Sequence, residues 1–188
     1  MTFLDGLLLS AYICQQSGEK CGFVVFTGKR PLQEGNSMFR GYDELTMDAK
    51  GRIGLPTRYH DRVQAECQGK FVLTVDLRET CLTLYPLTEW KAIEARFNSL
   101  PTANPAIALL KRRILGYATE VGLDAAGRFL VSPELRQFAH LDKGVVLAGQ
   151  GKKCEIWQKS AWDALQAQIL AADFSSAELA QAIDILAL

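Results

Sequence analysis

The sequence has no net charge, because lysine plus arginine and aspartate plus glutamate each number 21. Proteins that coat nucleic acid by bulk electrostatic attraction carry a large positive excess. The balance also holds locally, since residues 38–100 contain nine basic and nine acidic side chains and residues 101–188 contain the same numbers. Neither half is a basic arm, so any contact with DNA has to come from a local cluster.

Patterns for metal binding and for disulfides are also absent. The five cysteines, at positions 14, 21, 67, 81 and 154, are odd in number and form no Cys-x-x-Cys pair. The two histidines, His60 and His140, have no cysteine or carboxylate partner at ligand spacing. Neither a disulfide framework nor a zinc site is indicated, and a reducing cytosol fits best. We therefore expect no metal and no cofactor.

Long apolar runs and catalytic motifs are missing as well. No stretch approaches the roughly 20 apolar residues of a membrane-spanning helix, and segment 3–14 has Asp5 where a signal peptide has a basic start. There is no Gly-x-Ser-x-Gly motif, no phosphate loop and no cysteine near a histidine. We expect a soluble, cytoplasmic protein that is not an enzyme and has neither a membrane nor a small-molecule substrate as a partner.

What is present is a globular composition, with 48% apolar and 22% charged residues. Residues 1–37 show no clear period and end in the turn-rich run 31–37, so we place a boundary at Met38. One hypothesis is that Met38 is the natural start; the alternative is that 1–37 form a genuine tail. An intact N-terminal peptide of the natively expressed protein would contradict the first.

From Met38 onward the patterns predict an α+β fold. In the first half, the expected elements are a strand, turn and strand around 48–55, a short helix near 56–66, a hairpin from 70–75 and 81–85, and helices at 88–100 and 106–115. Gly116 is expected to close the last of these as a left-handed cap. In the second half, they are a strand and turn at 121–131, a helix at 133–139, a hairpin from 144–148 and 154–157, and a helix at 160–170. Ser175 and Glu178 form a capping box that predicts a final helix.

This region contains an internal sequence repeat. At an offset of 76, Asp48-Ala-Lys-Gly-Arg52 aligns with Asp124-Ala-Ala-Gly-Arg128. At an offset of 72, Tyr85 and Trp90 align with Trp157 and Trp162, and we expect these aromatic residues in the core. The repeat predicts a first unit at 38–100, a connector helix at 101–116, a second unit at 117–170 and a helical tail at 171–188.

The repeated Asp-x-x-Gly-Arg turn has a physical rationale. An aspartate oxygen accepts hydrogen bonds from the backbone N–H groups two or three residues later in the chain, and glycine adopts the positive φ that other residues resist. The predicted turn-forming residues are therefore Asp48 with Gly51 and Asp124 with Gly127. Two interpretations of the arginine stay open: it only pairs with the aspartate and staples the turn, or the turn presents it to DNA.

Several segments together resemble the bacterial MraZ family. They are Met38-Phe39-Arg40-Gly41, Asp48-x-Lys50-Gly51-Arg52-Ile53-x-Leu55-Pro56, Leu84-Tyr85-Pro86 and Gly149-x-Gly151-x-Lys153-x-Glu155-Ile156-Trp157. The resemblance covers Met38 to about Leu170. It implies two tandem AbrB-like (SpoVT-AbrB) halves that form a compact β-barrel flanked by helices. It also implies a ring-shaped homo-oligomer that binds direct repeats of double-stranded DNA in the promoter of its own division and cell wall gene cluster.

The same resemblance places the DNA contacts at specific positions. Lys50 and Arg52 of the first turn are the main candidates, and Arg58 and Arg128 are two more. Ala126 stands where the first turn has Lys50, so we expect the first turn to be the DNA-binding copy. His60 departs from the family, which more often has arginine there, and this weakens the case for a phosphate contact. The expected function is a nucleoid-associated transcriptional repressor.

An alternative function and two further basic clusters remain. AbrB-like proteins also act as antitoxin-like interaction modules, in which case the tail at 171–188 would hold a partner and DNA binding would be secondary. The run Lys111-Arg112-Arg113 lies late in a predicted helix, where positive charge suits the helix dipole. The pair Lys152-Lys153 lies in a glycine-rich turn without a phosphate-loop pattern. We interpret both clusters as solvated.

Overall fold

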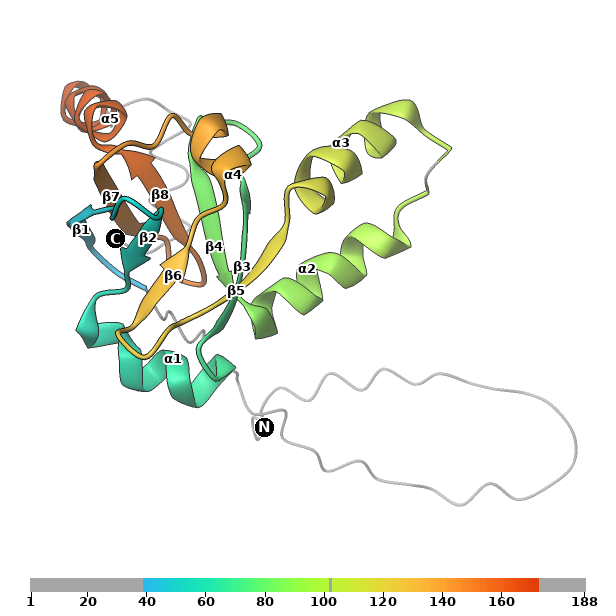
Figure 1. The fold of residues 1–188 in the computed structure, drawn as a ribbon. Helices are drawn as coiled ribbons and strands as arrows, with labels where there is room; N and C mark the ends of the chain where they lie inside the picture. The colour runs from blue at the N-terminus through green and yellow to red at the C-terminus, as the bar shows by residue number, and fades with distance from the viewer. Residues whose placement is uncertain (1–38, 102, 173–188) are drawn as a thin grey trace, which may run out of the picture. The chain divides into compact units, whose positions relative to one another are not determined.

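The computed structural model describes residues 39–101 and 103–172 (Figure 1). All of them belong to one unit of the chain, Gly35–Leu188. The predictions for residues 1–37, for Met38 as the start and for the capping box and final helix lie outside the described residues.

The predicted order of strands and helices is confirmed. The first half contains β1 (Tyr42–Thr46), β2 (Arg52–Gly54), the 3-10 helix η1 (Thr57–Tyr59), α1 (His60–Cys67), β3 (Lys70–Val75), β4 (Leu82–Pro86) and α2 (Leu87–Ser99). Helix α3 (Pro105–Gly116) follows. The second half contains β5 (Thr119–Gly122), β6 (Arg128–Leu130), α4 (Pro133–Phe138), β7 (Gly144–Gly149), β8 (Cys154–Gln158) and α5 (Lys159–Ala171). None of the described helices is long and apolar enough to cross a membrane.

Local sequence explains where the connecting helices begin. The side chain of Asn104 accepts the backbone N–H of Ala106, and Pro105 occupies the first turn of α3. Ser132 does the same for Leu135 at the start of α4, again with a proline in the first turn. Such caps satisfy free backbone N–H groups, and proline fits the first turn because it has no N–H to lose.

The prediction that Gly116 caps α3 in a left-handed conformation is wrong. Gly116 is the last residue of α3, and it is not among the glycines with positive φ. Tyr117 is the C-cap, in a right-handed conformation with φ −96° and ψ −4°. The chain turns out of the helix through a hydrogen bond from the N–H of Ala118 to the carbonyl of Leu115 and runs directly into β5, so a left-handed residue is not needed.

The two halves exchange strands. The larger sheet is antiparallel throughout and has the order β1-β7-β8-β4-β3-β5. Strand β1 of the first half pairs with β7 of the second, and β5 of the second half pairs with β3 of the first. The two hairpins meet where β4 pairs with β8. Each half therefore completes its sheet with a strand from the other.

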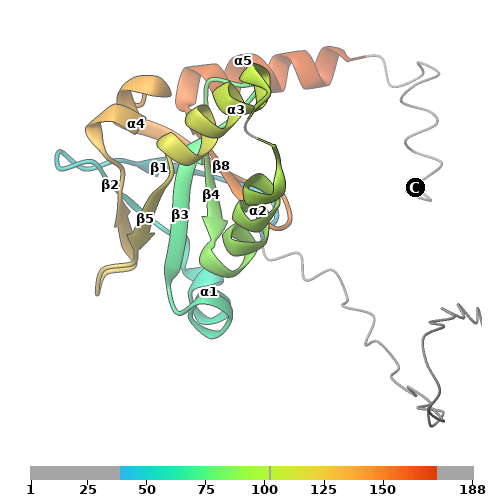
Figure 2. The ribbon, with the colours of Figure 1, turned by 90° about the vertical axis from the view of Figure 1, so that its right-hand side faces the viewer.

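A separate two-stranded ribbon, β2–β6, links the equivalent short strands of the two halves. Ile53 pairs with Phe129, its equivalent at the offset of 76, so the halves are related by a local twofold axis at this point. Figures 1 and 2 show the ribbon lying against the larger sheet. The α+β class with two tandem halves is thus confirmed. A closed barrel is not: β1 and β5 are the two edges of the larger sheet and do not pair with each other within the described part.

One apolar core joins both halves. Ile53 and Phe129 point inward from the ribbon and are essentially fully buried. They belong to the same cluster as Leu73, Leu84 and Ile156 of the larger sheet. Each such side chain contributes about 1.5–3 kcal/mol when fully buried. The ribbon is therefore anchored by its inward face, which leaves its other face for solvent.

Candidate nucleic-acid interface

The first Asp-x-x-Gly-Arg turn joins β1 to β2. One carboxylate oxygen of Asp48 (Oδ1) accepts the backbone N–H of both Lys50 and Arg52 at 2.9 Å, and the other (Oδ2) accepts Nε of Arg52 at 2.7 Å. Gly51 has φ +85°, and its N–H donates to the carbonyl of Asp48. These backbone and side-chain donors hold the pKa of Asp48 down at about 2, with the Arg52 N–H the strongest cause.

The second turn repeats this pattern bond for bond. Asp124 accepts the N–H of Ala126 and Arg128 at 2.9 Å, and Nε of Arg128 donates to it at 3.0 Å. Gly127 has φ +71°. The pKa of Asp124 is lowered, first by the Arg128 N–H and then by the Arg128 side chain. The predicted roles of Asp and Gly in both turns match these contacts.

The arginines of the two turns lie close to each other's aspartates. Nη1 of Arg52 is 3.9 Å from Asp124, and Nη1 of Arg128 is 3.9 Å from Asp48. All four side chains are about one-third exposed. The pairing of each arginine with its own aspartate, expected if the arginine only staples the turn, is therefore present. It extends into a neutral group of four charges, Asp48, Arg52, Asp124 and Arg128, which we call the charge quartet.

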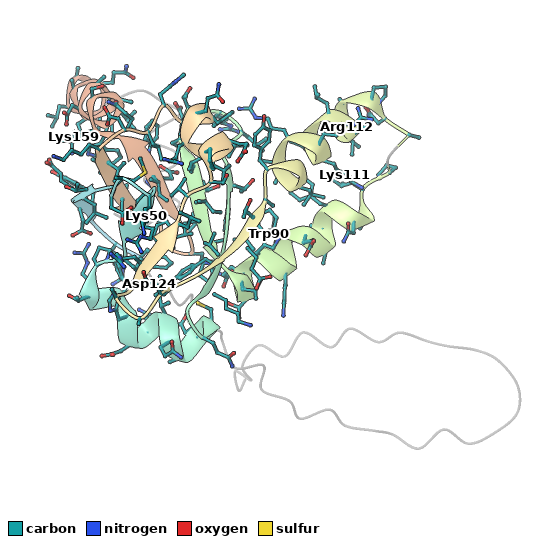
Figure 3. All side chains as sticks on the ribbon, viewed as in Figure 1. Lys50, Trp90, Lys111, Arg112, Asp124 and Lys159 are labelled. Carbon is teal, nitrogen blue, oxygen red and sulfur yellow. The ribbon has the colours of Figure 1, made fainter. Side chains whose placement is uncertain are left out.

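The outward face of the ribbon carries these arginines. Residues alternate across a strand, so Arg52 and Arg128 share the face opposite to the buried Ile53 and Phe129. Leu130, on that same face, is 53% exposed. Figure 3 places Lys50 and Asp124, one from each turn, beside the ribbon. In both arginines the hydrogen bond to the turn's own aspartate is donated by Nε.

The two turns differ in the exposed residue that precedes glycine. It is Lys50 in the first turn and Ala126 in the second, and both are exposed. They also differ slightly at the arginine, because Nη2 of Arg128 lies 2.9 Å from Asp124 in addition to the Nε bond. The first turn thus presents one more cation than the second.

Arg58 lies in η1, directly before helix α1. Its guanidinium forms a double hydrogen bond with Asp43 on β1, donates to the Tyr59 hydroxyl, and lies 4.6 Å from the centre of the Tyr59 ring. The Asp43 bonds raise the pKa of Arg58 further above its ordinary value. This pairing holds Arg58 against β1, away from the charge quartet's hydrogen bonds.

Two residues behind the turns were not predicted. The guanidinium of Arg136 on α4 packs on Gly51, and a Cβ there would lie 2.9 Å from Cζ. The ring of His60 on α1 packs on Gly127, where a Cβ would lie 2.4 Å from Cε1, and Nε2 of His60 bonds the carbonyl of Leu55. His60 and Arg136 are equivalent at the offset of 76. This equivalence was the sequence signal that could have shown that His60 and Arg136 play the same part, each packing on the turn of the other half.

The remaining basic clusters lie away from the ribbon. Figure 3 shows Lys111 and Arg112 out on α3. Lys111 donates to the carbonyl of Leu100, and Arg113 donates to that of Asp76. Lys152 pairs with Glu89 at 3.4 Å. The structure does not bring these clusters to the charge quartet.

The described cysteines are buried, and they are not gathered with other possible metal ligands. Cys67, Cys81 and Cys154 are free and buried, and burial raises the pKa of each thiol. Among residues 39–101 and 103–172, no group of three or more His, Cys, Asp or Glu side chains is placed to hold a metal ion.

Comparison with known proteins identifies similar chains. A family model described as "MraZ protein, putative antitoxin-like" matches residues 38–113 and again residues 114–184. A protein named transcriptional regulator MraZ from Halorhodospira halophila is 45% identical over 152 residues, which is 80% of this chain and 100% of that protein. Proteins of the same name from Pseudomonas putida and Pseudomonas aeruginosa are 44% and 43% identical over 135 residues, 72% of this chain and 89% of each relative.

Proposed function

The chain belongs to the MraZ family, and we propose that it is a sequence-specific, DNA-binding transcriptional regulator. Its relatives carry the name transcriptional regulator. The finer proposal is a cytoplasmic, nucleoid-associated repressor that assembles into a ring and binds direct repeats in the promoter of its own division and cell wall gene cluster.

The outward face of the β2–β6 ribbon carries this proposal. A two-stranded antiparallel ribbon fits into the major groove of B-DNA. Arg52 and Arg128 stand diagonally on its exposed face, and each is oriented by a bond from Nε to its own aspartate. Arg52, held through Nε, can direct its two Nη groups at the O6 and N7 of guanine, a contact that contributes about 1–3 kcal/mol of base discrimination. In Arg128, Nη2 also lies 2.9 Å from Asp124.

Lys50 completes the first turn as a DNA-binding element. Lys50 is exposed and comes two residues before Arg52 in the same turn, so it can neutralise a phosphate while the arginine contacts a base. The second turn has Ala126 at this position and makes the weaker contact. We therefore propose Lys50 and Arg52 as the main contacts, Arg128 as a lesser one, and Arg58 as a phosphate contact that depends on release from Asp43.

The neutral charge quartet supports the proposed oligomer. Asp48 and Asp124 offset the arginines that face DNA, and the chain as a whole has no net charge. Specific sites usually require many contacts to reach nanomolar affinity. In a ring, every contact after the first is effectively intramolecular, and this raises the overall affinity without new contacts. Direct repeats in the DNA match such an array of identical turns.

A gel-shift titration on DNA from upstream of the gene tests the function. The slope of log affinity against log salt falls by about 0.9 per phosphate contact. We expect steep salt dependence, preference for the multi-repeat fragment over a shuffled one, and loss of binding in Arg52→Glu with the oligomer intact. Arg112→Glu, which makes the same charge change on α3, is the matched control. Equal binding to the shuffled fragment would refute the proposal.

The second candidate is an antitoxin-like interaction module, because the matching family model is described as antitoxin-like. In this case a partner protein binds the tail at 171–188. Deleting residues 173–188 then removes partner binding and leaves DNA binding unchanged, whereas Arg52→Glu has the opposite effect.

A further inference from the structure

Leu130 is an apolar side chain on the outward face of the β2–β6 ribbon. The other residues of this face are Arg52 and Gly54 on β2 and Arg128 on β6. Leu130 is 53% exposed, and the inward face of the ribbon is filled by other side chains that are buried in the core. Single exposed leucines are common on protein surfaces. What sets Leu130 apart is its place among the residues proposed to contact DNA.

Leu130 lies directly opposite Arg52 in the ribbon. The register pairs Arg52 with Leu130 and Gly54 with Arg128. The Cβ atoms of directly opposite residues in an antiparallel pair are about 4.5–5.5 Å apart, and successive base pairs of B-DNA are about 3.4 Å apart along the helix axis. When Arg52 contacts a guanine, the neighbouring base pair therefore lies within reach of Leu130.

The two side chains reach a similar depth although leucine is shorter than arginine. Nε of Arg52 donates to Asp48 at 2.7 Å, and Nη1 of Arg52 lies 3.9 Å from Asp124. Both carboxylates belong to the turns of the ribbon itself, so these contacts hold the guanidinium close to the ribbon. A base edge that meets this guanidinium is then close enough for its neighbour to meet Leu130.

The chemistry of the major groove identifies the group that Leu130 fits. Leucine has no hydrogen-bonding group in its side chain, so it cannot recognise the donors and acceptors of the base edges. The C5 methyl group of thymine is the apolar group in the major groove, and apolar side chains contact it there. An arginine beside a leucine therefore suits a guanine next to a thymine.

The equivalent position in the first half has no side chain. At the offset of 76, Leu130 aligns with Gly54. Gly54 is not among the glycines with positive φ, and a Cβ there would lie at an ordinary 3.9 Å from Cγ of Arg128. Neither strain nor crowding requires glycine at this position. Arg52 thus has an apolar neighbour that Arg128 lacks, which makes the two ends of the ribbon unequal and suits direct repeats better than inverted ones.

We propose that Leu130 contacts the C5 methyl group of a thymine next to the guanine that Arg52 contacts. This inference rests on the proposed function and extends it, because it names a second base of the recognised site and the residue that selects it. The apolar contact comes from the second half and the arginine from the first, so the β2–β6 pairing brings the two together.

Replacing thymine by uracil tests the contact, because it removes the C5 methyl group and leaves the hydrogen-bonding groups of the base unchanged. DNA from upstream of the gene is amplified with deoxyuridine triphosphate in place of thymidine triphosphate. Loss of one apolar methyl contact weakens binding roughly fourfold. We expect the wild type to bind the uracil fragment more weakly by at least this factor, measured by gel-shift titration. Equal affinity for the two fragments would overturn the contact.

Variants of Leu130 show whether this residue detects the methyl group. Leu130→Ala should bind the thymine fragment as weakly as the wild type binds the uracil fragment, and should not distinguish the two. Leu130→Met, which keeps an apolar side chain of similar size, should retain the preference for thymine. A full preference for thymine in Leu130→Ala would assign methyl recognition to another residue and overturn the inference.

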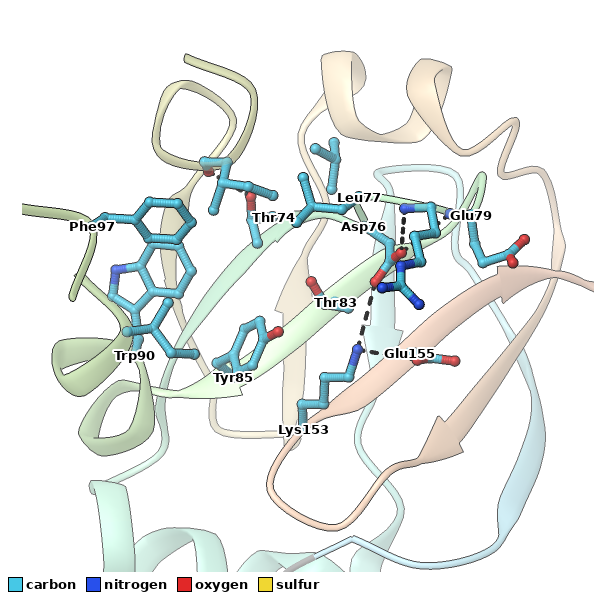
Figure 4. Close-up of a pocket in the computed structure, with 14 residues that line it drawn as sticks. Thr74, Asp76, Leu77, Glu79, Thr83, Tyr85, Trp90, Phe97, Lys153 and Glu155 are labelled. Carbon is cyan, nitrogen blue, oxygen red and sulfur yellow. Dashed lines mark hydrogen bonds and ion pairs between the residues drawn. The ribbon is translucent and has the colours of Figure 1, made fainter. Parts of the chain in front are cut away.

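Leu77→Ala is the matched control. Leu77 is 45% exposed and follows β3, where it lines a hollow of about 550 Å³ (Figure 4). Removing this leucine should leave the preference for thymine over uracil unchanged. The mass of Leu130→Ala, measured by light scattering, should equal that of the wild type, and a changed mass would make Leu130 a contact between copies and overturn the inference.

A shuffled fragment separates this inference from the proposed function. If the wild type does not prefer the promoter fragment to the shuffled one, the proposed function fails, and the contact fails with it. If it prefers the promoter fragment but binds the thymine and uracil forms equally, the regulator remains and only the contact of Leu130 with thymine is refuted.

Discussion

The turn at Asp48–Arg52 and the turn at Asp124–Arg128 make the same backbone hydrogen bonds and the same Asp–Arg bond through Nε. They differ at the exposed position before glycine, which is Lys50 in one and Ala126 in the other. What the copies share is explained by the fold, because a repeated fold repeats the bonds that hold it. A function specific to one copy has to come from the residues that differ between them, here Lys50 and Ala126.

The same comparison applies to the two long helices. Trp90 of α2 and Trp162 of α5 are both buried, as the repeat predicted. Tyr42 lies tilted against Trp162 with ring centres 5.4 Å apart, while Ala118 occupies the position equivalent to Tyr42 beside Trp90. The first half is thus hollowed on both sides of its tryptophan. In this chain, the first half carries both the extra cation and the hollows beside its tryptophan.

The largest expected effect comes from reversing charge at the ribbon. Under the proposed function, Arg52→Glu removes one guanine contact per subunit, a loss of about 1–3 kcal/mol each. Because the proposed ring repeats this loss, specific binding should fall at least a hundredfold. Arg128→Glu should reduce it less. Titration of both variants on the same multi-repeat fragment measures the difference, and an equal loss would remove the proposed inequality of the two turns.

Glycine substitutions should also separate the two turns. Gly51→Ala places a residue in the left-handed region, which costs about 1–2 kcal/mol, and its Cβ meets only the end of the Arg136 side chain. Gly127→Ala carries the same cost and also pushes His60 away from the Leu55 carbonyl, which adds about 1 kcal/mol. Urea unfolding should therefore rank Gly127→Ala as the less stable variant.

Gly116→Ala is the control for these substitutions. A Cβ there meets nothing within 4 Å, and Gly116 is inside α3 with an ordinary φ. Alanine in a helix is favoured over glycine by about 0.8–1 kcal/mol, so this variant should be more stable than the wild type. Destabilisation of all three variants alike would contradict the account of the turns.

Exchanging the exposed residues of the turns should change only the salt dependence of binding. Lys50→Ala should reduce the slope of log affinity against log salt by about 0.9 per subunit in contact, with little change in base preference. Ala126→Lys should increase the slope if the second turn lies near phosphate. No change in either variant would place both turns away from the DNA backbone.

The smallest effect is on stability at low pH. The pKa of Asp48 is lowered to about 2 from an ordinary 3.8, so its stabilising contribution is present above about pH 4 and is lost as the pH falls toward 2. The difference in melting temperature between the wild type and Asp48→Asn should therefore be largest near pH 6 and shrink toward pH 2. A difference that is constant across this range would show that ionisation of Asp48 is not the cause.

Much of the local structure could be predicted because its causes are local. Asp48 and Gly51 form the predicted turn, and Ser132 with Pro133 begins the predicted helix. Gly116 was assigned wrongly because whether a helix ends in a left-handed residue depends on where the chain goes next, and here that is set by the pairing of β5 with β3. The exchange of β1 and β5 between halves was not predicted, since the period of a strand does not identify its partner.

The sequence named the residues of the candidate site but did not predict what surrounds them. Lys50, Arg52 and Arg128 were named from the MraZ resemblance, and the structure places Arg52 on β2, Arg128 on β6 and Lys50 in the turn before β2. The approach of Arg52 to Asp124 is a contact between segments more than 70 residues apart, and sequence spacing does not encode such distances. The MraZ resemblance is confirmed by the family model and the relatives.

The most direct test of the central claim is photo-cross-linking from the two turns. Lys50→Cys and Ala126→Cys, each in a chain with serine at positions 14 and 21, are labelled with a photoactivatable thiol reagent and irradiated with the multi-repeat promoter fragment. The account predicts strong cross-linking to the repeats from position 50 and little from position 126. Equal yields, or a higher yield from position 126, would contradict it.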